Sequence, residues 1–361
     1  MSTKRFFPIV AILLAFLLSA CENKTQDISS LKPLSVVEMD GYTLAIDLFN
    51  RKIAIVPRGE PLPQEVLDNF KPTAIVRTPV EKIIVASGTY DPSIIIGLGK
   101  GDAIIGVTDS RDEFHSPEML KLFDEGKVKY IGEYNSIDLE SLVEMKPDVI
   151  LISSTSTLEL VEFLGFPVVA DYSNEVNDIE NQLELISFLG MLLGEKEKGD
   201  KRVQELKASL KAIGERVEGL HRPKLTWGVY FDKRVFVLGG DYWVADLLEI
   251  VGADYVFPEI DMNGAGFSLE EFYIRSKDAD IFFITQPSND HAVDMSLMLK
   301  WYDGLKDMKA FGDQGTVAMT YSWLWENAWY VDEIAMDLGA VVHPELYPDR
   351  KLTYVEIIKE K

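Results

Sequence analysis

Two stretches of the chain share one pattern: residues 136–153 read SIDLESLVEMKPDVILIS and residues 268–285 read SLEEFYIRSKDADIFFIT. In each, a Glu (Glu140, then Glu270) precedes a helical stretch, a turn containing Lys and Asp follows, and an apolar strand ends the unit. Helix-to-strand units of this kind are typical of parallel sheets that helices cover on both faces. The recurrence predicts a chain with two similar α/β lobes.

The segments around these units match in the same order. Residues 83–107 correspond to residues 235–257, and residues 157–171 correspond to residues 298–320. Strands alternate with helices in each set, which indicates parallel β-α-β connections. Because three units match in the same order, we expect the second lobe to repeat the first element by element.

The N-terminus carries an export signal. Residues 1–20 have a basic start, an apolar run and a small-residue end, which is typical of a secretory signal and too short for a spanning helix. Leu18, Ser19, Ala20 and Cys21 resemble the bacterial lipobox, in which the Cys is acylated and becomes the new N-terminus. Because Cys21 is the single cysteine of an exported chain, its position favours a lipid anchor over a structural thiol.

Three further segments complete the organisation. Strand-like runs separated by turns at Asp40-Gly41 and Asn50-Arg51 predict a small β-meander. Helical spacing without proline predicts a long linking helix, bent or broken at Gly194. The expected organisation is a signal peptide at 1–20, a lipid-anchored tether at 21–33, the β-meander at 34–80, the N-terminal lobe at 81–174, the linking helix at 175–218 and the C-terminal lobe at 219–361.

The composition is that of a globular protein exported to a surface. Of 361 residues, 59 are acidic and 36 basic, for a net charge of −23. This acidity argues against nucleic acid and anionic membrane surfaces as partners, so contact with the membrane is expected only through the lipid anchor. A monomer is expected, located on the outer face of the cell membrane or in a periplasm.

A ligand is expected in a cleft between the lobes. Ligands of open parallel sheets bind beyond the carboxyl ends of the strands, and facing lobes would bring both sets of loops to one cleft. Arg111 could hold an anionic group or pair at the surface with Asp109 or Asp112, and Phe231 could instead belong to a strand core. The loops are rich in hydroxyl and aromatic groups, and the candidate ligand contacts are Ser87, Thr89, Tyr90, Arg111, Ser154, Thr155, Phe231, Asp241, Tyr242, Trp243, Tyr321 and Trp323.

Taken together, the lipobox, the strand-loop-helix opening of each lobe, the two Glu units and the linking helix resemble the solute-binding proteins of ABC importers for iron-siderophores, haem or cobalamin. The resemblance covers residues 81 to about 340. It implies two lobes joined by one long helix, an ABC importer permease as partner, and a metal chelate as ligand with no resident cofactor.

The resemblance also implies a docking role for the repeated glutamates. In that family one acidic residue on each lobe binds an arginine pocket of the permease, and the matching positions are Glu140 and Glu270. Glu271 is adjacent to the second position and competes with it. For either residue alone, a helix N-terminal charge favoured by the helix dipole is the simpler explanation, and the matched placement in both lobes favours docking.

Other functions have weaker support. No nucleophile elbow, phosphate-binding loop or paired-histidine motif appears, so no enzyme activity is expected. A direct zinc or manganese binder is the stronger rival, but the chain has only four histidines. His115 and His291 follow cleft loops, where each is either an axial ligand of a chelated metal or, as we favour, a solvated loop residue. Among chelates an iron complex is preferred and a corrinoid is the alternative, since the spacing does not separate them.

Overall fold

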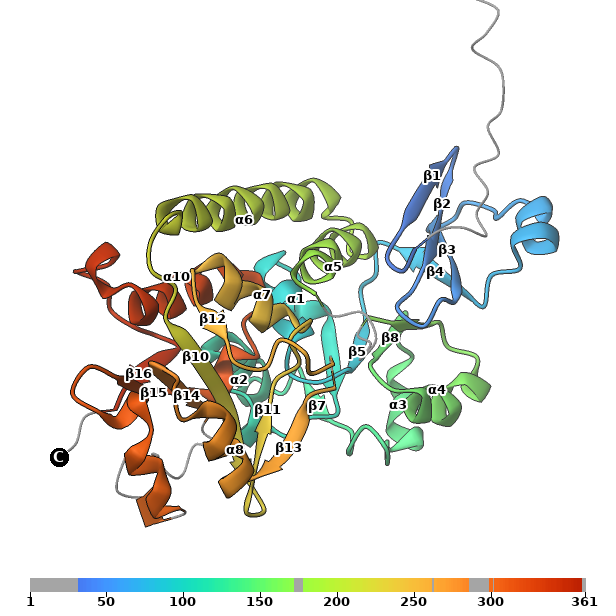
Figure 1. The fold of residues 1–361 in the computed structure, drawn as a ribbon. Helices are drawn as coiled ribbons and strands as arrows, with labels where there is room; N and C mark the ends of the chain where they lie inside the picture. The colour runs from blue at the N-terminus through green and yellow to red at the C-terminus, as the bar shows by residue number, and fades with distance from the viewer. Residues whose placement is uncertain (1–31, 172–177, 262, 286–298, 301, 359–361) are drawn as a thin grey trace, which may run out of the picture. The chain divides into compact units, whose positions relative to one another are not determined.

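A parallel five-stranded sheet forms the first lobe (Figure 1). The strand order is β7-β6-β5-β8-β9, and all neighbours run parallel. Every residue of β5 and β8 is buried, as expected for a sheet covered on both faces. The strands are β5 (Ile83–Ala86), β6 (Ile104–Val107), β7 (Lys129–Tyr130), β8 (Val149–Ile152) and β9 (Val168–Ala170), and the helices are α1 (Asp91–Gly97), α2 (Pro117–Asp124), α3 (Leu139–Met145) and α4 (Thr155–Val161). The computed structural model describes residues 32–171, 178–261, 263–285, 299–300 and 302–358.

The predicted β-meander is confirmed and gains one strand. β1 (Val36–Met39), β2 (Tyr42–Ile46) and β3 (Lys52–Pro57) are antiparallel, and β4 (Ala74–Thr78) adds parallel to β3. The buried carboxylate of Asp47 accepts a hydrogen bond from the backbone N–H of Ala170 at 3.1 Å, and the Leu48 N–H donates to the Ala170 carbonyl at 3.0 Å. The meander is thus joined to the edge strand β9.

The linking segment forms two helices, with the expected break at Gly194. They are α5 (Ile179–Leu192) and α6 (Lys196–Val217), and Gly194 has a φ of 73°, a left-handed conformation that glycine adopts without strain. The two helices pack closely beside the break, where a Cβ on Gly199 would lie 2.9 Å from the Ile186 carbonyl oxygen.

A mixed sheet forms the second lobe, in the order β13-β11-β10-β14-β15-β16. β10 pairs in parallel with β14 and β12, and β14 with β15, whereas β11, β13 and β16 are antiparallel to their neighbours. The predicted α/β class is confirmed. The elements are β10 (Lys224–Phe231), β11 (Arg234–Val237), β12 (Asp254–Tyr255), β13 (Ala265–Ser268), β14 (Ile281–Thr285), β15 (Thr316–Thr320), β16 (Val355–Ile357), α7 (Trp243–Ile250), α8 (Leu269–Ser276) and α10 (Val331–Val342).

Two details of the predicted repeat are wrong. Residues 235–237 were matched with the first strand of the first lobe, but β11 turns back antiparallel on β10, and β10 takes the central position beside β14. The sequence also predicts a last helix from about Trp325 to Leu338, yet α10 begins at Val331 after two short 3-10 turns, Ser322–Leu324 and Ala328–Tyr330. Of the helix that apolar spacing predicts at residues 296–305, the structure describes residues 299–300 and 302–305, and from Asp303 the chain forms a 3-10 turn, Asp303–Asp307.

The second sheet separates two cores because side chains alternate along its strands. Trp227 and Phe283 join the large core that continues through the linking helices into the first lobe. Phe282 and Ile284 face a smaller core together with Phe272 of α8. The two lobes therefore share one apolar core.

Candidate functional site

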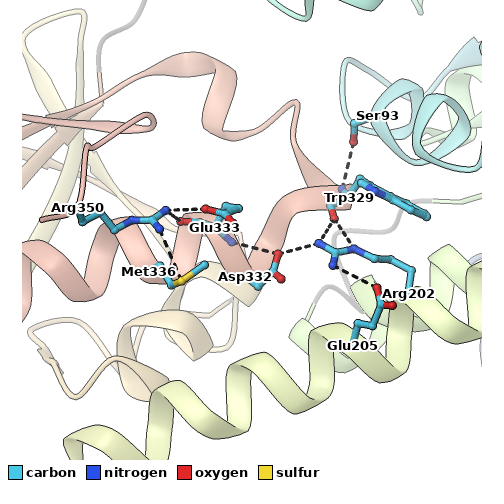
Figure 2. Close-up of polar contacts among 8 residues, drawn as sticks. All are labelled: Ser93, Arg202, Glu205, Trp329, Asp332, Glu333, Met336 and Arg350. Carbon is cyan, nitrogen blue, oxygen red and sulfur yellow. Dashed lines mark hydrogen bonds and ion pairs between the residues drawn. The ribbon is translucent and has the colours of Figure 1, made fainter. Parts of the chain in front are cut away.

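A short 3-10 segment of the second lobe packs directly on α1 of the first. The backbone N–H of Trp329 donates to Ser93 Oγ at 3.3 Å, and the Trp329 carbonyl accepts from Arg202 of α6 at 2.9 Å (Figure 2). Arg202 also pairs with Asp332 at 2.7 Å. A Cβ on Gly97 would lie 2.2 Å from the Trp329 ring, so only glycine permits this approach. The segment around Trp329 thus contacts both α1 of the first lobe and the linking helix α6.

Aromatic rings continue this junction toward the loops. Tyr90 of the first lobe and Trp243 of the second have ring centroids 6.1 Å apart, and Trp325 lies 5.9 Å from Trp243 and 6.0 Å from Tyr242. Trp243 is only 1% exposed. The expectation that Trp243 lines an open cleft is therefore corrected: it packs in the core, because α7 begins at this residue and directs it inward.

Buried carboxyls lie at the carboxyl ends of β5 and β9. Ser87 Oγ is within hydrogen-bond distance of the carboxyls of both Asp91 and Asp171, the latter at 3.1 Å, and both acids are 1% exposed. Burial raises the pKa of both carboxyls, and the nearby charge of Asp91 raises that of Asp171 further. A proton held on one of the two relieves their repulsion.

Asp109, which follows β6, lies in the same acidic environment. Burial, followed by the charges of Glu113, Glu133, Asp91 and Glu326, raises its pKa from 3.8 to about 7. The carboxyl edge of the first lobe thus brings together several carboxyl groups with raised pKa values beside the junction.

The Asp109→Asn variant is expected to be more stable than the parent at pH 8 and equally stable at pH 4. In the folded chain Asp109 keeps its proton up to about pH 7, whereas in the unfolded chain it loses the proton near pH 4. As the pH rises from about 4 to about 7, the parent therefore loses stability that the asparagine variant keeps. The expected difference in the free energy of unfolding at pH 8 is about 2 kcal/mol, after allowance for the partial exposure of Asp109. Urea unfolding at both pH values checks this, and a gain that does not depend on pH would contradict it.

A cavity of about 480 Å³ opens between the lobes, and its lining includes none of the three acids Asp91, Asp109 and Asp171. The first lobe contributes α1 and the start of α2, and the second contributes the segment around Trp323 and the chain before β16. Aromatic and hydroxyl groups dominate the lining, which consists of Ser93, Ile96, Phe114, His115, Ser116, Pro117, Glu118, Leu120, Trp323, Asn327, Tyr330, Thr353 and Tyr354.

Glu326 joins the two lobes at this cavity. Its carboxylate, 4% exposed, accepts hydrogen bonds from the backbone N–H of His115 at 2.9 Å and of Ser116 at 3.3 Å, and it pairs with His115 Nδ1. The His115 ring also lies 5.2 Å from the Trp323 ring. The prediction of His115 as a solvated loop residue is wrong, because Glu326 holds it across the junction.

The other candidate contacts are spread over the loops. Arg111 pairs with Asp124 of α2 at 3.0 Å rather than with Asp109 or Asp112. Tyr321 and Trp323 stack at 3.9 Å, and Trp323 Nε1 donates to the Thr353 carbonyl at 3.3 Å. Ser154 caps α4. Among the rest, Ser87, Thr89, Tyr90 and Tyr242 are half-buried, and Thr155, Phe231 and Asp241 are exposed.

Four functional candidates were not singled out by the sequence. Asp91, Asp109 and Asp171 each follow a parallel strand of the first lobe, so the rule that placed the cleft at strand ends could have found them. Glu326 carried no such signal, because its partner His115 lies 211 residues away in the sequence.

The two repeated glutamates occupy the same helical position. Asp138 caps α3 by accepting from the N–H groups of Glu140 and Ser141, and Ser268 caps α8 by accepting from the Glu271 N–H. Counted from these caps, Glu140 and Glu270 are both second helical residues, and both are exposed. This register matches Glu140 with Glu270 rather than with Glu271.

Several predictions fall outside the described residues, among them Cys21, the loop at 286–290 and His291. Across the described residues, no three His, Cys, Asp or Glu side chains are arranged to hold a metal ion. None of the helices in those residues has the length and apolarity needed to cross a membrane.

The chain is similar in sequence and in fold to known periplasmic binding proteins. The model of a family described as periplasmic binding protein matches residues 83–311. An uncharacterized lipoprotein of Methanocaldococcus jannaschii is 22% identical over 328 residues, 86% of this chain and 77% of that protein. A vitamin B12-binding protein of Vibrio vulnificus is 22% identical over 56% of this chain and 70% of its own length. The fold resembles that of a periplasmic heme binding protein from Pseudomonas aeruginosa, with a TM-score of 0.62, 16% identity, and coverage of 78% of this chain and 99% of that one.

Proposed function

Because this chain belongs to the periplasmic binding protein family, a family of solute-binding proteins rather than enzymes, we propose that it captures an iron complex, siderophore or haem, between its lobes and delivers it to an ABC importer. The observation that carries the proposal is the inter-lobe cavity. It lies where both lobes contribute loops, and its aromatic walls with hydroxyl and imidazole edges suit a bulky chelate with polar groups at its rim.

A corrinoid is the second candidate. The vitamin B12-binding protein among the relatives supports it, whereas the heme-binding structure supports the first choice. A bare zinc or manganese ion has less support, because the described residues contain no group of three metal-binding side chains. In either chelate the metal belongs to the transported ligand, and the side chains that line the cavity would bind that ligand.

Docking to the importer is assigned to Glu140 and Glu270. Their carboxylates lie exposed at matched helix positions, one on each lobe. A carboxylate binds an arginine fork through two parallel hydrogen bonds, and two such points fix the orientation of the bound protein. The lipid anchor at Cys21 would keep the chain at the outer face of the membrane beside the importer, in line with the lipoprotein relative.

Tryptophan fluorescence tests the choice of ligand. Trp323 lines the cavity, so a chelate bound there is expected to quench its emission. The purified chain is titrated with ferric siderophores, haemin and cyanocobalamin, and saturable quenching at micromolar concentration by one of them is expected. Absence of quenching by all three, together with a rise in melting temperature on adding zinc or manganese, would overturn the proposal.

A further inference from the structure

Large apolar side chains lie exposed beside both docking carboxylates. Val143, three residues after Glu140, is 47% exposed, and Ile274, four residues after Glu270, is 60% exposed. Residues three and four apart are neighbours on one face of a helix. Each lobe therefore presents a carboxylate and a branched aliphatic side chain side by side.

The two helices sit on their lobes in the same orientation. Leu142 and Phe272, each four residues after the helix cap, are both 0% exposed and fix the buried face of α3 and α8. The opposite face must then point to solvent in both lobes. Val143 is the fifth residue after its helix cap and Ile274 the sixth, so the two lie on this outer face at neighbouring rather than identical positions.

The carboxylates of Glu140 and Glu270 form no ion pair or hydrogen bond with other described residues. Some acidic side chains on the described surface pair with a basic residue, as Asp124 does with Arg111 and Asp148 with Arg58, and others do not. Two exposed carboxylates, each next to exposed apolar surface, fit a cationic partner that also offers apolar area.

We propose that Val143 and Ile274 are apolar anchors of the docking surface, each covering the methylene stem of an importer arginine whose guanidinium binds the adjacent glutamate. An arginine side chain has both parts, since its stem packs on apolar surface while its charged fork pairs with a carboxylate. This inference rests on the proposed function. It adds to the two docking glutamates the apolar side chains that exclude water from their ion pairs. Exclusion of water strengthens an ion pair, so the anchors and the carboxylates act together.

The test uses the full-length chain and the ABC importer that co-purifies with it from detergent-solubilised membranes of the source cells. The importer is placed in nanodiscs, and the dissociation constant is measured by interferometry for Val143→Ser, Ile274→Ser and the double variant. Each single change is expected to weaken docking roughly ten-fold, and the double change more. The matched control is Leu220→Ser, which alters a 39% exposed leucine that follows α6 and has no docking glutamate beside it.

The outcomes separate the anchors from the proposed function. Melting temperatures within about 2 °C of the parent are expected, because surface substitutions seldom affect folding. If Glu140→Arg with Glu270→Arg abolishes docking while the serine variants dock like the parent, the anchors are overturned and the docking glutamates stand. If no ABC importer is retained by the parent chain, the proposed function fails and the anchors with it.

Discussion

The double variant Glu140→Arg with Glu270→Arg is expected to lose chelate uptake by roughly a hundred-fold or more while binding its ligand as the parent does. Each reversal places a cation opposite the importer's cation, and repulsion at both ends of the docking surface is added to the loss of two ion pairs. Both residues lie exposed on first helical turns, so their replacement leaves the cavity walls unchanged.

Matched controls are available in each lobe. Glu271 lies next to Glu270, and Glu162 is an exposed glutamate of the first lobe. Reversal of these two charges is expected to leave uptake near the parent level, which shows that position matters and not net charge. Loss of ligand affinity in the Glu140→Arg, Glu270→Arg variant would place these residues in the cleft and contradict the docking role.

Glu326→Ala is expected to lower the free energy of unfolding by about 3 kcal/mol. The change removes a buried acceptor of two backbone N–H groups at the start of α2 and leaves the His115 ring without its partner across the lobes. Urea unfolding at pH 7 measures the loss.

The Glu326→Gln variant serves as the control for this prediction. Its amide oxygen can still accept from the backbone N–H groups but carries no charge, so about half of the stability should return. If the alanine variant unfolds within about 0.5 kcal/mol of the parent, Glu326 does not hold the lobes together.

Much of the fold could be predicted because it depends on local patterns. The Glu units predicted α3 and α8 with the strands that follow them, and the Asp40-Gly41 turn predicted the first hairpin of the meander. The hairpin of β10 and β11 was missed, because its turn at Asp232-Lys233 contains no glycine, although both residues adopt a positive φ.

The candidate site was harder to predict because its groups meet through the tertiary fold. Trp243 was expected in a loop, but α7 begins at this residue and buries it. His115 is held by Glu326, and Arg111 pairs with Asp124. No periodicity in the sequence indicates either contact. Glu140 and Glu270 could be matched from the sequence, and the helix caps place both at the second helical position, which Glu271 does not occupy.

Uptake by reconstituted vesicles tests the central claim most directly. The importer is reconstituted in proteoliposomes with ATP enclosed on the side of its nucleotide-binding subunits. The vesicles are then given a radiolabelled chelate, chosen because it quenches the tryptophan fluorescence of this protein. The account predicts that the label accumulates only when ATP and this protein are both present, and that the Glu140→Arg, Glu270→Arg variant does not replace the parent. Equal accumulation with and without the chain would contradict it.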